Sequence, residues 1–142
     1  MLTGLFGAAL IGLLYATWYR GPAPANAWQA MAVNDVIFCI VGLLGVWVLV
    51  ATAVSSTGAV PIAAAVTASF GGLLASVLAL VRLIWPPDLG PGPTDRAAGV
   101  WLATAAAIGL VLSALRSIRD ERRGGGVEVP ITPLPAPKGG GA

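Results

Sequence analysis

Six charged residues lie in two connections between apolar stretches, and they are the side chains whose types and spacing could form a binding site. The set contains three arginines and three aspartates, Arg20, Asp35, Arg82, Asp88, Asp95 and Arg96. Opposite charges near lipid headgroups can pair more strongly than exposed salt bridges in water, which contribute about 0 to 1 kcal/mol. We interpret this charge cluster as a structural clamp or a solvated rim, and a small-molecule site there is the sharper alternative.

Catalytic residue sets are nearly absent from the sequence. Histidine does not occur, and Cys39 is the single cysteine, so a metal centre built from imidazole and thiolate ligands is not expected. The motifs GxSxG and HExxH are missing, and no phosphate-binding glycine loop follows a strand. We therefore expect no enzymatic activity, no catalytic residue, no metal site and no cofactor. We also expect no nucleic-acid partner.

Four apolar stretches contain no charged side chain and dominate the composition. Hydrophobic residues make up 57% of the chain and charged residues 10%, against about 25% charged residues in soluble domains. The stretches are residues 2–19, 36–54, 62–81 and 97–115. At about 1.5 Å per residue, each can cross a hydrocarbon core of about 30 Å as a helix. The sequence predicts an all-α, polytopic membrane protein whose residues 1–123 form a four-transmembrane-helix bundle.

Small residues at four-residue spacing suit close contact between these helices. Gly4, Ala8 and Gly12 form such a series in the first stretch. Lipid gives no hydrophobic drive for helices to associate, so close backbone approach at small residues matters most. Ala68 with Gly72 and Ala103 with Ala107 follow the same pattern in the later stretches. The pattern indicates a compact bundle and leaves the helix pairings open.

Two expectations concern polar groups at membrane depth. Trp47 lies near the middle of the second stretch, where its indole N–H meets no water. We expect it to face the bundle and to find a hydroxyl or carbonyl acceptor there. None of the four stretches contains an ionisable acid or base, which argues against ion or proton transport. Asp35 and Arg82 are expected to approach each other just outside the membrane.

The distribution of basic residues predicts the orientation. After Leu115 the chain carries five Lys/Arg and three Asp/Glu, whereas the two charged connections are balanced. The positive-inside rule places this tail, and with four spans both termini, in the cytoplasm. The first arginines of the tail, expected to contact anionic headgroups, are Arg116, Arg119, Arg122 and Arg123. Residues 124–142 are rich in proline and glycine and are expected to be disordered.

Short motifs in both halves of the chain form a recognisable series. They are Trp18-Tyr19, Ala27-Trp28-Gln29-Ala30, Arg82-Leu83, Pro86-Pro87-Asp88, Ala98-Gly99-Val100-Trp101-Leu102 and Ser117-Ile118-Arg119-Asp120-Glu121-Arg122. Over roughly residues 18–123 the chain resembles an uncharacterised family of small four-span membrane proteins from high-GC actinobacteria. The resemblance implies a four-helix fold in the bacterial cytoplasmic membrane and no established activity.

Two functions are compatible with these patterns. The first is a non-enzymatic accessory or scaffold subunit that binds other membrane proteins or lipid, or that self-associates. The second is a pore-forming or small transport protein of the holin type, which would also be small, Ala/Gly-rich and followed by a charged tail. The first fits better, because the sequence offers packing surfaces without a catalytic set.

Overall fold

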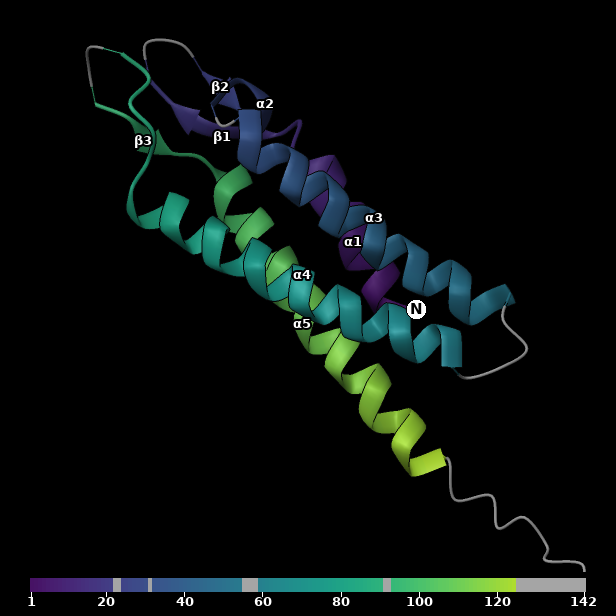
Figure 1. Ribbon diagram of the computed structural model, residues 1–142. Coiled ribbons are helices and arrows are strands. Elements are labelled where there is room, and N and C mark those ends of the chain that lie inside the picture. The colour runs from purple at the N-terminus through teal and green to yellow at the C-terminus, as the bar shows by residue number, and fades with distance from the viewer. Residues whose placement is uncertain (22–23, 31, 55–58, 91–92, 125–142) are drawn as a thin grey trace, which may run out of the picture.

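The computed structural model describes residues 1–21, 24–30, 32–54, 59–90 and 93–124. Three long helices run side by side, and a group of short strands covers one end of them (Figure 1). The elements in chain order are α1 (Leu2–Leu13), β1 (Thr17–Arg20), β2 (Ala25–Asn26), α2 (Ala27–Ala30), α3 (Ala32–Val54), α4 (Ala59–Ile84), β3 (Asp95–Arg96) and α5 (Ala98–Gly124). The expected disorder of the tail concerns residues 125–142, which lie outside the described residues.

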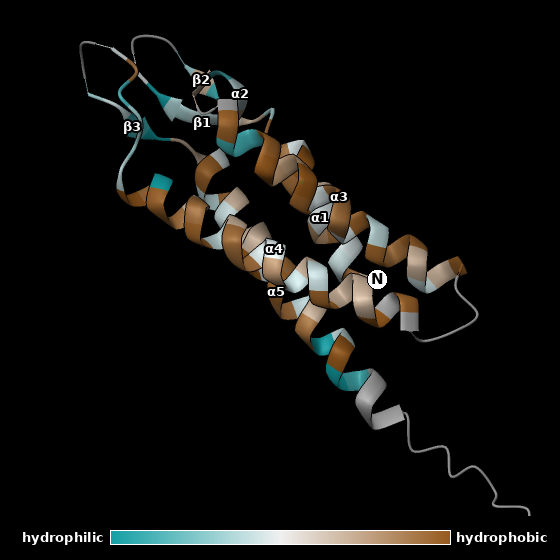
Figure 2. Ribbon diagram, in the orientation of Figure 1, coloured by the Kyte–Doolittle hydropathy of each residue, from teal (hydrophilic) through white to brown (hydrophobic). Residues whose placement is uncertain are grey.

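Three helices are long and apolar enough to cross a membrane. The candidate spans are Val33–Val54 in α3, Ile62–Ile84 in α4 and Ala98–Asp120 in α5, with 22, 23 and 23 residues. Many large apolar side chains of these helices are exposed, and the three helices consist mainly of hydrophobic residues, coloured brown in Figure 2. The predicted second, third and fourth spans are confirmed, and the protein is a multi-pass integral membrane protein.

The predicted first span is wrong beyond Leu13. Helix α1 has 12 residues, which is about 18 Å against a hydrocarbon core of about 30 Å. The indole Nε1 of Trp18 folds back and donates to the Leu13 carbonyl at 2.7 Å, where the helix ends. This bond occupies a carbonyl that has no partner within the helix. The following residues, rich in β-branched and aromatic types, form β1 instead of further helix.

A small antiparallel sheet is the second departure from the expected all-α fold. The strand order is β2-β1-β3, with Tyr19 opposite both Ala25 and Arg96. The pairing of β1 with β3 is extended by a further hydrogen bond, in which the Ala97 N–H donates to the Trp18 carbonyl at 2.8 Å. Strand β1 is therefore central, so its backbone groups find partners on both sides although its two middle residues are buried.

Alanines are buried on both α4 and α5, the two helices that pack most extensively. Ala68, Ala75 and Ala79 of α4 are completely buried, as are Ala103 and Ala107 of α5. The predicted close packing at Ala68, Ala103 and Ala107 is thus confirmed. Side chains of one carbon let the two backbones approach, which is the main source of attraction between helices in lipid.

Glycines make the contact between α1 and α3. A Cβ atom on Gly7 would lie 2.5 Å from the Gly42 carbonyl oxygen and 3.0 Å from the Gly45 Cα, so nothing larger fits. The predicted series in the first helix is only partly correct. Gly4 is buried, but Ala8 is exposed and a Cβ on Gly12 would contact nothing. The helix rotation places Gly7, not Gly12, against α3.

Candidate functional site at the sheet-capped end

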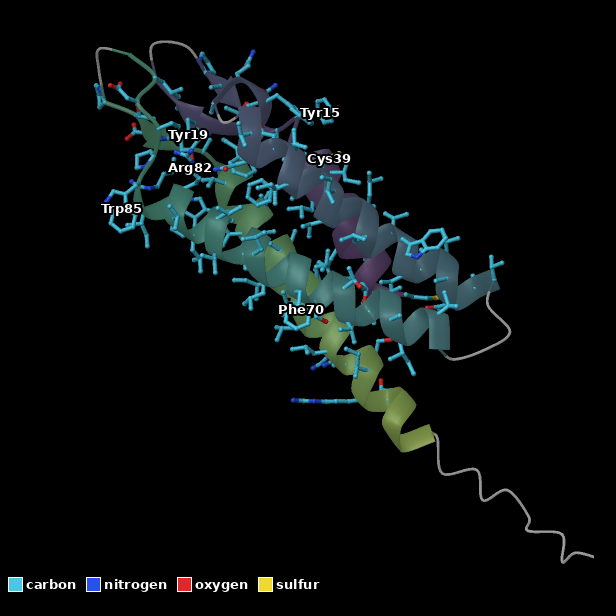
Figure 3. The ribbon with its side chains drawn as sticks, in the orientation of Figure 1. Tyr15, Tyr19, Cys39, Phe70, Arg82 and Trp85 are labelled. Atoms are coloured by element: carbon cyan, nitrogen blue, oxygen red, sulfur yellow. The ribbon has the colours of Figure 1, made fainter. Side chains whose placement is uncertain are left out.

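We call the three strands, α2 and the adjoining ends of α3, α4 and α5 the capped end. Two adjacent aromatic residues of β1 attach the sheet to the long helices. The completely buried Trp18 packs on Phe38 of α3 with ring centroids 5.7 Å apart. Tyr19, also completely buried, donates its hydroxyl proton to the Arg82 carbonyl of α4 at 3.1 Å. Figure 3 shows Tyr19 and Arg82 together at this end.

Asp35 is the most unusual residue of the capped end. It lies in the first turn of α3, inside the candidate span that begins at Val33, and it is 0% exposed. Neither carboxylate oxygen has a hydrogen-bond partner among the described residues. The expectation that no span contains an ionisable residue is therefore wrong. The apolar stretch was read from Val36, but the helix begins before it and the sheet covers its first turn.

Arg82 and Tyr19 are the titratable neighbours of Asp35. The positive charge of Arg82, in the last turn of α4, acts on the Asp35 carboxyl. However, the carboxyl accepts no hydrogen bond from the Arg82 guanidinium. Burial raises the pKa of the Tyr19 phenol above its ordinary value of 10.0, and the negative charge of Asp35 adds to this. The charges of Arg82 and Arg96 oppose the rise in pKa.

Arg96 closes the C-terminal end of α4. Its Nε donates to the Leu83 carbonyl, and its Nη2 donates to the Ile84 carbonyl at 2.9 Å. The last carbonyls of a helix lack partners within the helix and carry partial negative charge, so a guanidinium suits this position. Arg96 thus joins β3 to α4 through main-chain carbonyls.

The remaining charges of the predicted cluster lie further out. Arg20 and Asp95 are exposed and face each other across β1 and β3. Opposite charges in this register favour strand pairing by about 0.2 to 1 kcal/mol. Asp88 is exposed and accepts a hydrogen bond from the Gly90 N–H at 3.1 Å, within its own loop. The six charges therefore divide into an inner group of Asp35, Arg82 and Arg96 and an outer group.

The arginines that were predicted to contact lipid headgroups lie at the opposite end of the bundle. Arg116 and Arg119 are exposed on α5, while the side chains of Arg122 and Arg123 lie outside the described part of the chain. A hollow of about 390 Å³ separates the start of α1 from the ends of α3 and α5. It is lined by Met1, Leu2, Thr3, Val48, Thr52, Ser113, Arg116, Ser117 and Asp120. We call this the basic end.

Trp47 does not face the bundle, so that expectation is wrong. Its side chain is 55% exposed on the outer face of α3. Residues of α3 that face inward include Gly42 and Gly45, which contact the Gly7 region of α1 at distances that leave no room for an indole. Trp47 instead lines a shallow apolar groove of about 420 Å³ with Ile40, Leu43, Leu44, Val46 and Val50.

Within the described residues, no group of three His, Cys, Asp or Glu side chains could hold a metal ion. Comparisons of the chain with protein families, curated proteins and solved structures find no match. The class of protein therefore follows from the fold, as an integral membrane protein with three long apolar helices and a short fourth.

The burial of Asp35 was not predicted from the sequence. A signal for it was present, because the β-prone run from Thr17 to Arg20 is followed by a Gly-Pro pair, which indicates a strand that could cover this residue.

Proposed function

We propose that the protein is a non-enzymatic accessory or scaffold subunit that docks another membrane protein against the outer face of α3. The observation that carries this proposal is the exposed Trp47. The residue lies seven positions before the end of the candidate span at Val54, which is about 10 Å along the helix axis. The residue therefore lies inside the span, at a depth without water.

An indole donor in hydrocarbon lacks an acceptor unless another protein supplies one. A partner helix laid in the groove beside Leu43 and Val50 could offer a hydroxyl or a carbonyl to Trp47 while covering the apolar walls. Interhelical hydrogen bonds in model transmembrane peptides contribute about 1 to 2 kcal/mol. That energy is enough to select a partner and orientation on a surface that is otherwise uniformly apolar.

The setting proposed for this role is the bacterial cytoplasmic membrane, with both termini in the cytoplasm. The basic tail supports this orientation. The start of α1 and the last turns of α5 line the same hollow, which agrees with a shared side for the two ends. A cysteine at Gly140 in a Cys39→Ser background should resist an impermeant thiol reagent in intact cells, whereas one at Gly90 should react. The reverse labelling would invert the proposed topology.

Trp47→Phe tests the docking role, because it keeps an aromatic ring and removes only the donor. Trp101→Phe on α5 is the matched control, since Trp101 is 56% exposed. Loss of a hydrogen bond of about 1 to 2 kcal/mol should lower recovery of a partner from native membranes in mild detergent roughly five- to thirtyfold. The control variant should recover the partner normally. Equal recovery with Trp47→Phe would refute docking through this residue.

The second candidate function is the holin-type pore or small transporter, which the buried Asp35 favours, because acids within spans usually mark ion pathways. Several helix hydroxyls favour the scaffold instead, because they bond to their own helix rather than to a channel. Thr52, Ser76 and Thr104 donate to the carbonyls four residues earlier. Controlled expression separates the two functions: arrested growth with loss of membrane potential would favour the pore, and unchanged potential the scaffold.

A further inference from the structure

Asp35 differs from the other aspartates of the chain in its surroundings. Asp88, Asp95 and Asp120 are exposed and can be solvated. Asp35 is completely buried, and Phe38, which packs on Trp18, lies one turn later on the same helix. A carboxylate removed from water needs hydrogen-bond donors to replace its hydration, and an uncharged carboxyl needs far less.

The titratable groups that act on Asp35 do not bond to its carboxyl oxygens. On β1, the Tyr19 hydroxyl donates to the Arg82 carbonyl. On β3, the Arg96 guanidinium donates to the carbonyls of Leu83 and Ile84. From α4, the charge of Arg82 reaches Asp35, but no N–H of this guanidinium bonds to the carboxyl oxygens. The protein therefore holds the Asp35 carboxyl in place without providing the bonds that would stabilise its negative charge.

We propose that Asp35 is a proton-binding site inside the membrane bundle and that a proton is the ligand it carries at neutral pH. Binding moves one proton from water onto a carboxylate oxygen of Asp35 and forms one O–H bond. The negative charge disappears, and the positive charges of Arg82 and Arg96 remain, both at the C-terminal end of α4, which favours cations. This inference does not rest on the docking role of Trp47.

Infrared spectroscopy of the full-length protein in liposomes tests the site. At about pH 7 an ordinary aspartate, with a pKa of about 4, is fully ionised. We expect the unmodified protein to show the carbonyl stretch of one protonated carboxyl per chain. Labelling the aspartate side-chain carboxyls with ¹³C should shift the whole signal, and this measurement needs no substitution that could disturb folding.

Asp35→Asn should abolish the signal, because an amide has the same shape and no carboxyl proton. Asp95→Asn is the matched control on an exposed aspartate and should leave the signal unchanged. A protein without a protonated carboxyl at this pH would overturn the proposal, as would a signal that does not shift with ¹³C-aspartate. Complete loss of the signal on adding Na⁺ at constant pH and ionic strength would show a metal-cation site instead and also overturn it.

Discussion

The two ends of the bundle both carry charged residues but differ in how far these residues are covered. At the capped end, strands fold back over the helix ends, and Trp18, Tyr19 and Asp35 are completely buried. At the basic end, α5 continues as a helix, and Arg116 and Arg119 remain exposed. A residue at the boundary of an apolar stretch is therefore buried where another segment of the chain folds over it, as at Asp35. It remains exposed where no segment covers it, as at Arg116.

The two ends should also contribute unequally to the stability of the fold. One strand of the capped end joins three helices, because Trp18 packs on α3, Tyr19 bonds to α4 and the Trp18 carbonyl holds the start of α5. The last turns of α5 at the basic end extend beyond the other helices (Figure 1). Substitutions at the capped end should therefore lower the free energy of unfolding, while substitutions at the basic end should change mainly the interaction with lipid.

Trp18→Ala should have the largest effect. It removes a completely buried side chain and its 2.7 Å bond to the end of α1. Replacing a buried aromatic residue by alanine costs about 3 to 5 kcal/mol. The loss should appear as a lower unfolding midpoint in a denaturing-detergent titration. Trp101→Ala, at a tryptophan that is 56% exposed, is the control, and equal losses in the two variants would contradict the comparison.

Gly99→Ala should be next, because it pushes the start of α5 away from β1. A Cβ at this position would collide with the Thr17 carbonyl and lie 2.8 Å from Trp18 Cδ1. Overpacking of this kind costs about 1 to 3 kcal/mol. Gly12→Ala is the matched control, since its Cβ would contact nothing within 4 Å. If both variants unfold at the same midpoint, the strand does not hold α5 in place.

Tyr19→Phe removes one hydroxyl and tests the bond to α4. A typical hydrogen bond contributes about 1 kcal/mol to stability, and Tyr15→Phe, at a tyrosine that is 69% exposed, should be neutral. Because the folded pKa of Tyr19 is raised above 10.0, its contribution is present below about pH 10 and is lost as the pH rises further. Tyr19→Phe should therefore reduce the alkaline loss of stability, and an unchanged alkaline profile would contradict this assignment.

Hydropathy predicted the three long helices because a continuous apolar segment in lipid must form its backbone hydrogen bonds within itself, and a helix does so. It failed at residues 14–19, which were included in the first apolar stretch although α1 ends at Leu13 and β1 begins at Thr17. A strand can replace helix there because β2 and β3 supply backbone partners from distant parts of the chain. Hydropathy contains no information about such pairing, so Leu13 could not be identified as the end of α1.

The sequence identified the six charged residues of the cluster, but it did not predict that they divide into an inner and an outer group. Arg82 and Arg96 lie at helix or strand ends, and the sequence marks these positions. The burial of Asp35 depends on how β1 and α2 fold over the first turn of α3, and this is a tertiary property. Trp47 was placed wrongly because the glycines that exclude it from the bundle, Gly42 and Gly45, act through their contact with α1.

The smallest effect on stability is expected at the basic end. Replacing Arg116, Arg119, Arg122 and Arg123 by glutamine should change the free energy of unfolding by no more than about 0.5 kcal/mol, because substitutions at exposed positions such as Arg116 and Arg119 rarely change it more. Binding to anionic vesicles should weaken, since each basic residue near such a surface contributes about 1 kcal/mol. The neighbouring Asp120 reduces this attraction.

Arg20→Gln is the control for that variant, because it removes an exposed arginine from the capped end, opposite Asp95. It should lower stability by about 0.2 to 1 kcal/mol through the lost cross-strand pair and leave selectivity for anionic lipid unchanged. A basic-end variant that keeps one orientation and the same lipid selectivity in reconstituted bilayers would show that its arginines are only solvated. The two ends would then differ in burial alone, since neither would use its charges to contact lipid.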